Sequence, residues 1–214
     1  MNYQEFEQEF ARLGENYKTA DVDKFIRELI KRKEDVSFLR DVILEKQEYH
    51  RVYYKVSMAQ IDGIDGKMQF IEDNFDKMQD WWHVDQLPQF MQKVEAFEPY
   101  LQKAKEYIYS DMPFVRRWGY VMFMPRLVKC DKAPMYLFDL FKDDDEYYVQ
   151  MAEGWLISYL AIYHPEQTLK YMKECTLNYN IVGKAIQKIC DSYRISDEWK
   201  SKFREVRERY RNVK

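Results

Sequence analysis

The chain has 214 residues and a formal net charge of −3, which excludes a uniformly basic nucleic-acid-binding surface but not a local basic patch. Charged residues make up 33% of the sequence, and glycine and proline number six each. This composition favours long helices joined by tight turns over a β-sheet protein. The 18 tyrosines and five tryptophans indicate a partly hydrated recognition surface, because both side chains carry a polar group.

The three cysteines and three histidines show no metal-binding pattern. Cys130, Cys175 and Cys190 form no CxxC pair, and the histidines are far apart in the sequence. We therefore expect buried thiols in a reducing cytoplasm. No apolar run approaches the roughly 18 residues of a membrane-spanning helix, so we expect a cytoplasmic protein without a membrane partner.

The N-terminal third has helical rather than alternating periodicity. Apolar residues at helical spacing predict helices over 2–13 and 21–32, with Gly14 ending the first. Three further helices are predicted over 35–47, 49–61 and 66–79.

The second half of the sequence repeats itself. Copies begin at Asp111, Asp145 and Asn178, which are 34 and 33 residues apart, and each places a valine four residues after this polar start. A further helix is predicted between successive copies, over 132–142 and 165–174. A period of this length with two helices per unit indicates a helical solenoid.

The tetratricopeptide and ankyrin patterns are both absent, so we predict an all-α, HEAT-like helical repeat fold. We expect a single domain over 1–214. It would consist of N-terminal helices (1–79), repeats (80–193) and a basic C-terminal helix (194–214).

The segment 80–90, DWWHVDQLPQF, holds the main candidate site. Trp81 and Asp85 are four residues apart, so on a helix they share one face. Pro88 suits the first turn of a following segment. An alternative interpretation is that Trp81 belongs to the core and that Asp85 is a solvated or capping residue.

Equivalent helices of a solenoid line one concave surface. We therefore expect three successive units to present side chains to the same strip: Trp81 with Asp85, then Arg116, Arg117 and Trp118, then Trp155.

At these residues the chain resembles the AlkD-like DNA alkylation-repair glycosylases, which are all-helical HEAT-like proteins. The resemblance covers about half of the sequence. The Trp-x-x-x-Asp motif of that family stands as Trp81 and Asp85, and its arginine as Arg117 in VRRWGYV. Its second tryptophan stands as Trp155 in Ala-x-Gly-Trp, with Pro165 ten residues later.

The resemblance implies a base-excision repair enzyme that removes positively charged N3- or N7-alkylated purines from duplex DNA without extruding the base. We expect a monomer, because a curved solenoid that grips duplex needs no partner. Asp85 would stabilise the oxocarbenium-like sugar and orient the attacking water. Trp81 and Trp155 would pack against the deoxyribose, and Arg117 would hold the neighbouring phosphate. We expect no cofactor, because the alkylated purine leaves as a neutral base.

Some residues depart from the family pattern. Met151 and the run Ile181-Val182-Gly183 stand where basic or polar residues are common, which weakens the electrostatic attraction to DNA. The acidic run 143–146 is interpreted as a helix N-terminal cap region rather than a metal site.

Two basic regions can supply the missing attraction. Residues 24–33 carry five basic side chains against one acidic, and the tail 194–214 carries eight against four, although such a tail is commonly a solvated helix face. The predicted DNA-binding residues are Lys31, Arg32, Lys33, Trp82, Arg116 and Trp118.

Two other functions stay open at this point: a non-catalytic protein that grips bent or damaged duplex, and a protein-interaction scaffold. Only the glycosylase requires Asp85 together with both tryptophans. Release of 3-methyladenine or 7-methylguanine from a methylated duplex separates the three hypotheses.

Overall fold

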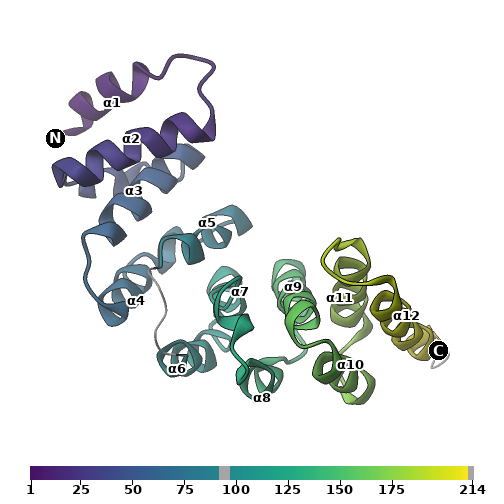
Figure 1. Ribbon diagram of the computed structural model, residues 1–214. Helices are drawn as coiled ribbons and strands as arrows, with labels where there is room; N and C mark the ends of the chain where they lie inside the picture. Colours follow the sequence, from purple (N-terminus) through teal and green to yellow (C-terminus); the bar gives the residue numbers. More distant parts are fainter. Residues whose placement is uncertain (92–96, 212–214) are drawn as a thin grey trace. The chain divides into compact units, whose positions relative to one another are not determined.

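The computed structural model describes residues 1–91 and 97–211. These residues form twelve α-helices and five short 3-10 helices, and no strand occurs among them (Figure 1). The chain divides into two compact units, residues 1–93 and 94–214. None of the helices in the described ranges has the length and apolar character needed to cross a bilayer. An all-α fold is therefore confirmed, while a single domain over 1–214 stays a prediction.

Five α-helices lie in the described part of the first unit, residues 1–91. They are α1 (Tyr3–Ala11), α2 (Thr19–Arg32), α3 (Gln47–Ala59), α4 (Ile64–Glu72) and α5 (Trp81–Asp85). Short 3-10 helices lie at Ser37–Asp41, Phe75–Lys77 and Leu87–Gln89.

The predicted helix over 35–47 is wrong, because only Ser37–Asp41 is helical and its turn is of the tighter 3-10 kind. The carboxylate of Asp35 accepts hydrogen bonds from both the N–H and the hydroxyl of Ser37 and so favours a turn at this point. The predicted helix over 66–79 is divided into α4 and a 3-10 turn at Phe75–Lys77.

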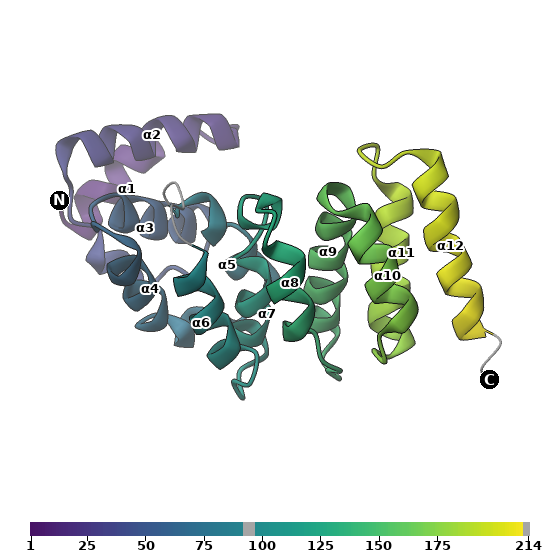
Figure 2. The ribbon, with the colours of Figure 1, turned by 60° about the horizontal axis from the view of Figure 1, so that its bottom comes forward.

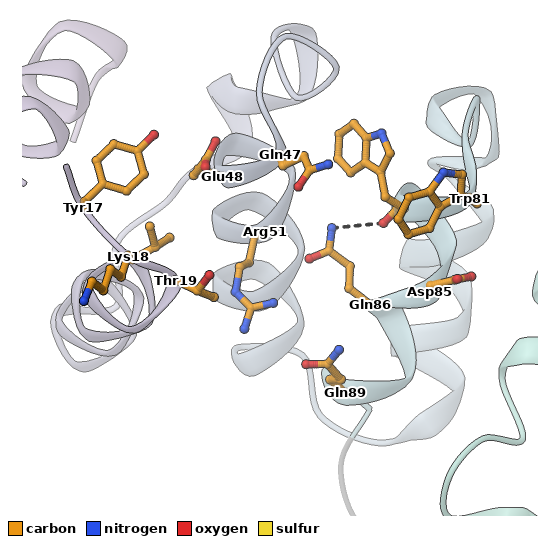
Figure 3. A pocket seen from close by; sticks show the side chains of 12 residues that line it. Tyr17, Lys18, Thr19, Gln47, Glu48, Arg51, Trp81, Asp85, Gln86 and Gln89 are labelled. Carbon is orange, nitrogen blue, oxygen red and sulfur yellow. Dashed lines mark hydrogen bonds between the residues drawn. The ribbon is translucent and has the colours of Figure 1, made fainter. Parts of the chain in front are cut away.

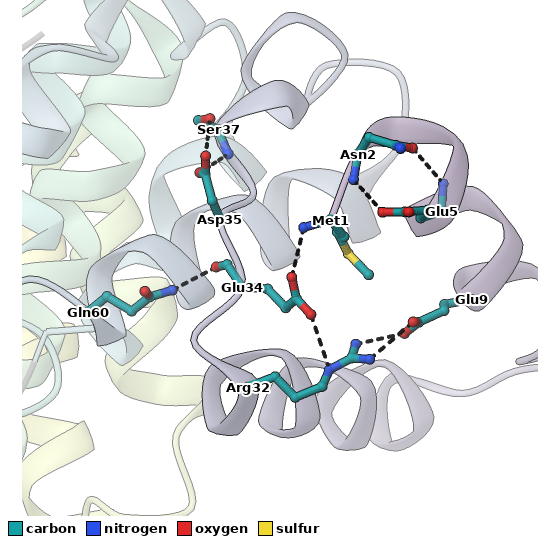
Figure 4. A network of polar contacts seen from close by, with 9 residues as sticks. All are labelled: Met1, Asn2, Glu5, Glu9, Arg32, Glu34, Asp35, Ser37 and Gln60. Atoms are coloured by element: carbon teal, nitrogen blue, oxygen red, sulfur yellow. Dashed lines mark hydrogen bonds and ion pairs between the residues drawn. The ribbon is translucent and has the colours of Figure 1, made fainter.

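Aromatic rings form the core where α1, α2 and α3 meet. Phe6, Phe10, Phe25 and Tyr49 lie with ring centroids 5.7–5.9 Å apart. A capping box between Asn2 and Glu5 starts α1. Figure 4 shows how polar contacts join the start of α1 to the segment that follows α2.

Residues 97–211, the described part of the second unit, form seven α-helices. They are α6 (Glu98–Tyr107), α7 (Pro113–Val121), α8 (Ala133–Leu137), α9 (Tyr147–Tyr163), α10 (Pro165–Glu174), α11 (Tyr179–Asp191) and α12 (Asp197–Arg211). Short 3-10 helices at Leu127–Lys129 and Phe138–Leu140 complete it.

The helices of the second unit stack in two layers. In one layer α9 packs between α7 and α11; in the other, α6 packs on α7, α10 on α9, and α12 on α10 and α11 (Figures 1 and 2). The helices α7, α9 and α11 begin just after the three repeat starts read from the sequence. The predicted HEAT-like repeat is therefore confirmed in this unit.

Close packing of α9 on α11 explains the glycine of the Ala-x-Gly-Trp motif. A Cβ added to Gly154 would lie 3.0 Å from both the backbone nitrogen of Ala185 and the Cβ of Lys184. A side chain there would push the two helices apart. Gly154 therefore allows α9, the helix that carries Trp155, to pack closely against α11.

Candidate functional site

Helix α5 presents the predicted Trp-x-x-x-Asp motif. The Asp80 carboxylate accepts a hydrogen bond of 2.7 Å from the backbone N–H of Trp81 and so starts the helix. His83 and Val84 are buried and hold the opposite face against the unit. Trp81 is 45% exposed and Asp85 is half-buried, so both reach the surface. Pro88 lies in the first turn of the following 3-10 helix, as predicted.

A pocket of about 550 Å³ lies beside α5, and Trp81, Trp82 and Asp85 all line it. The facing walls come from Lys18 and Thr19 at the start of α2, and from α3 (Figure 3). Sequence reasoning missed these walls, because they come from helices whose apolar spacing predicts packing and says nothing of a cavity. Trp81 and Asp85, two of the four predicted catalytic residues, therefore line the same pocket.

Two stacked imidazoles contact two residues of the pocket lining, Trp82 and Gln86. His50 and His83 are buried with ring centroids 5.0 Å apart. Burial lowers the pKa of His50 well below 6.5, and the neighbouring His83 lowers it further. Burial likewise lowers the pKa of His83. Neutral rings can therefore accept hydrogen bonds in this layer.

Gln86 connects this layer to the pocket. Its side-chain nitrogen lies 2.7 Å from Nδ1 of His50 and donates to the backbone carbonyl of Trp82 at 3.3 Å. The indole of Trp82 packs against both imidazoles. The orientation of Trp82 and Gln86 is thus fixed by neutral histidines.

The three residues Arg116, Arg117 and Trp118 do not share a face of α7. Successive helical residues are about 100° apart, so three in a row cannot all point to one strip. Trp118 is 0% exposed and belongs to the core, so its prediction as a DNA-binding residue is wrong. Arg117 is 4% exposed and donates to the backbone carbonyl of Tyr148.

Arg116 is held by the acidic run that precedes α9. Its guanidinium donates two hydrogen bonds to the Asp144 carboxylate, at 2.7 and 3.1 Å. Asp144 also accepts from the N–H of Glu146, the residue at the N-cap of α9. The run therefore precedes a helix as expected, but Asp144 binds Arg116 instead of capping α9 directly. Phosphate contacts for Arg116 and Arg117 stay predictions.

Trp155 belongs to a row of side chains that winds gradually around α9. The row has a spacing of four residues, and all of its members are exposed or half-buried. We call it the aromatic ladder; it consists of Tyr147, Met151, Trp155, Tyr159 and Tyr163.

Basic side chains lie over the rings of the aromatic ladder. Lys184 and Lys188 of α11 lie 4.9 Å from the Tyr147 ring centroid and 5.7 Å from that of Trp155. Arg194 lies 5.4 Å from the Tyr159 centroid. Sequence reasoning missed these lysines, although their own four-residue spacing on α11 signals a shared face. The ladder and its cations form a surface suited to a polyanion.

The sequence profile described as DNA alkylation repair enzyme matches residues 6–189, which is most of the chain. The chain belongs to this family. No curated protein and no solved structure is found to match it. The match begins well before residue 80, so the N-terminal helices belong to the family pattern even though they carry no motif recognised in the sequence.

Three basic residues lie at the end of α2 in this DNA alkylation repair enzyme, and one of them, Arg32, is held in ion pairs. Arg32 donates to both carboxylate oxygens of Glu9, at 3.0 and 2.7 Å, and lies 3.5 Å from the Glu34 carboxylate (Figure 4). Lys31 and Lys33 are exposed. Arg32 therefore joins α1 to α2, and DNA contact by the three residues stays a prediction.

The C-terminal helix of the enzyme has partly compensated charges. Lys202 pairs with Glu198 at 2.7 Å, and Arg207 donates to the hydroxyl of Tyr179 at 2.8 Å. Lys214 and the side chains of Arg209 and Arg211 lie outside the described residues. The three cysteines are free thiols. They are half-buried, whereas the sequence predicted buried thiols.

The predicted catalytic residues divide between the two units of the enzyme. Trp81 and Asp85 lie together in the first unit, and Arg117 and Trp155 lie in the second. The common site of all four residues stays a prediction.

Proposed function

We propose that this DNA alkylation repair enzyme is an N-glycosyl hydrolase that excises positively charged N3- or N7-alkylated purines from duplex DNA. The proposal rests on the family match together with one observation, the outward-facing pair of Trp81 and Asp85 on α5. We further propose that it acts as a cytoplasmic monomer in base excision repair.

Asp85 supplies the charge that this reaction needs. Water attacks the anomeric carbon of the sugar as the bond to the purine ring nitrogen breaks. The bonding electron pair stays with the purine, which thereby loses its positive charge and leaves as a neutral base. Positive charge develops on the sugar, where a nearby carboxylate stabilises it and takes up the proton of the attacking water.

Trp81 supplies an exposed indole one helical turn from Asp85. The face of an indole ring attracts a cationic centre and packs against a sugar. Arg117 and Trp155, in the second unit, are proposed to assist by holding a phosphate and by packing against the sugar. Their roles can be tested separately from those of the first unit.

The deciding experiment incubates the full chain with a methylated duplex and measures free 3-methyladenine and 7-methylguanine. Release with formation of abasic sites is expected. Duplex binding without release would identify a non-catalytic DNA-binding protein, and the loss of both would favour a protein-interaction scaffold.

The variant Asp85→Asn should excise roughly 100–1000-fold more slowly, because it removes an electrostatic stabiliser of the transition state. Its affinity for the duplex should be unchanged. Asp80→Asn provides the matched control, since an asparagine can still cap α5. Equal excision by Asp85→Asn and the wild type would overturn the assignment of Asp85.

A further inference from the structure

Helix α5 is too short to keep its position by itself. It has five residues, and an isolated helix of fewer than about 12 residues is marginal in water. Trp81 and Asp85 therefore stay in place only while other parts of the chain hold α5. Two contacts with imidazole nitrogens lie at its ends, one just before the helix and one just after it.

The first contact lies at the start of α5. Nδ1 of His83, in the third position of the helix, accepts a hydrogen bond of 3.0 Å from the backbone N–H of Gln79. A side chain at this helical position reaches back to a preceding N–H in the same way in a capping box. Because a backbone N–H only donates, Nδ1 of His83 carries no proton, and the neutral ring has its proton on Nε2.

The second contact lies at the end of α5. Gln86, its C-cap residue, places its side-chain nitrogen 2.7 Å from Nδ1 of His50 on α3 (Figure 3). The same nitrogen lies 3.3 Å from the backbone carbonyl oxygen of Trp82, and a carbonyl oxygen requires a donor. The amide therefore also donates to Nδ1 of His50, so this ring carries its proton on Nε2 as well.

The surroundings of the two rings favour the neutral form. The rings are stacked with centroids 5.0 Å apart, so a charge on one opposes a charge on the other. On α3 the ring of Tyr54 lies 4.4 Å from that of His50, and burial raises the pKa of the Tyr54 hydroxyl, which stays neutral. At the start of α5, burial lowers the pKa of His83, and the charge of Asp80 offsets this effect in part.

We propose that His50 and His83 are positioning residues that hold α5, the helix of the catalytic pair, through Nδ1 of their neutral rings. The proposal rests on the function proposed above. Nε2 of each ring has no hydrogen-bond partner among the described residues, so the Nδ1 contacts are the hydrogen bonds by which these rings hold the chain.

A proton added to Nδ1 turns either ring from an acceptor into a donor. The backbone N–H of Gln79 cannot then find an acceptor on His83. The amide of Gln86 could turn its oxygen toward His50, but that oxygen would face the backbone carbonyl oxygen of Trp82. Acid therefore weakens the attachment of α5 at both ends, and excision slows with it.

The first experiment determines the tautomers of the wild type by ¹⁵N NMR of the full chain, labelled in its three histidines. We expect His50 and His83 to carry the proton on Nε2 at pH 8. Nε2 of His164 donates to the carbonyl of Val128 at 2.9 Å and provides a reference for this tautomer. A proton on Nδ1 of His50 or His83 at this pH overturns the proposal, and the measurement needs no variant.

The second experiment measures single-turnover excision by the wild type and His83→Asn between pH 5 and 8. In asparagine the amide oxygen is bonded to Cγ, as Nδ1 is in histidine, and it accepts hydrogen bonds without taking up a proton in this range. The wild-type rate should fall with decreasing pH, by up to about tenfold per pH unit once the ring is protonated. The variant should lose this fall. Parallel pH profiles overturn the proposal.

Two further variants separate positioning from other effects. His83→Leu keeps an apolar side chain but removes the acceptor, so excision at pH 8 should be about 3–10-fold slower with unchanged affinity for the duplex. His164→Gln, in the second unit, keeps a donor for Val128 and should retain the wild-type pH profile. A profile flattened equally by His164→Gln, or a wild-type rate in His83→Leu, would contradict the assignment.

Failure of this inference is distinguishable from failure of the proposed function. The backbone N–H signal of Gln79 should shift as His83 takes up its proton, and this titration needs no catalysis. It persists even if the chain releases no base from a methylated duplex. Conversely, excision that depends on Asp85 but has the same pH profile in His83→Asn leaves the hydrolase in place and overturns the role of the histidines.

Discussion

The pocket of the first unit and the aromatic ladder of the second each lie close to a buried ionisable group, and these groups respond oppositely to pH. Behind the pocket residue Trp82 lie His50 and His83, whose pKa values are lowered by burial. On α9, the helix that carries the ladder, Glu153 is 0% exposed, and burial raises the pKa of its carboxyl to about 8. Acid therefore destabilises the first unit and alkali the second.

The two surfaces also differ in what they offer a ligand. The pocket places a carboxylate beside two indoles, which suits chemistry at the sugar of a single nucleotide. The ladder combines aromatic rings with lysine and arginine side chains, which suits the sugar-phosphate backbone. We therefore propose that the first unit supplies the carboxylate of the reaction and that the ladder of the second unit supplies electrostatic attachment. The predictions below test this division.

The largest effect is expected for Glu153→Gln. One oxygen of Glu153 accepts from the N–H of Lys142 at 3.3 Å, and the other has no hydrogen-bond partner among the described residues. Because the pKa in the folded chain lies above the ordinary 4.5, Glu153 contributes stability below pH 4.5 that is lost as the pH rises through 8. The variant should raise the free energy of unfolding at pH 9 by an amount on the order of a few kcal/mol.

Urea unfolding at pH 5 and pH 9 checks this prediction. The gain should be concentrated at pH 9, where only the wild type must bury a charged carboxylate. Glu166→Gln, at an exposed position on α10, is the matched control and should change neither value. A gain of equal size at both pH values would mean that packing, and not ionisation, distinguishes the variant.

A smaller effect of opposite direction is expected for the histidine layer. Both folded-state pKa values lie below the ordinary 6.5, so the unfolded chain binds more protons and stability falls as the pH drops below 6.5. With two histidines the free energy of unfolding should fall by up to roughly 2.7 kcal/mol per pH unit. His50→Phe keeps a ring of similar size and should halve that slope. Thermal unfolding between pH 5 and 7 measures it, and an unchanged slope would exclude His50 as its source.

The repeat and the α5 motif were predictable because each depends on local spacing. The polar starts at Asp111, Asp145 and Asn178 correspond to α7, α9 and α11, and the four-residue spacing of Trp81 and Asp85 gives a common face wherever α5 forms. Neither inference requires knowledge of which other helices pack nearby.

What the sequence could not reveal depends on contacts between distant segments. Trp118 is buried together with Val115, three residues before it, because this side of α7 faces the core. That spacing could have indicated the buried side, whereas the packing partners of α7 could not be read from VRRWGYV. The pocket has walls from α2, α3 and α5, so it exists only once these helices are assembled. Arg32 forms an ion pair with Glu9, which lies 23 residues away in the sequence.

The smallest effect, and the most direct test of the division, concerns Lys184 and Lys188 beside the ladder. If each neutralises one phosphate, Lys184→Gln/Lys188→Gln should lower the salt-dependence slope of duplex binding by about 2. Affinity at 0.15 M salt should fall roughly 10–30-fold, while the rate of excision from saturated complexes stays near that of the wild type. Lys200→Gln/Lys202→Gln on α12 removes the same charge from side chains already paired with Asp197 and Glu198, and it should change the slope little. The reverse outcome, with the α12 pair controlling the slope, would move DNA attachment from the ladder to the C-terminal helix.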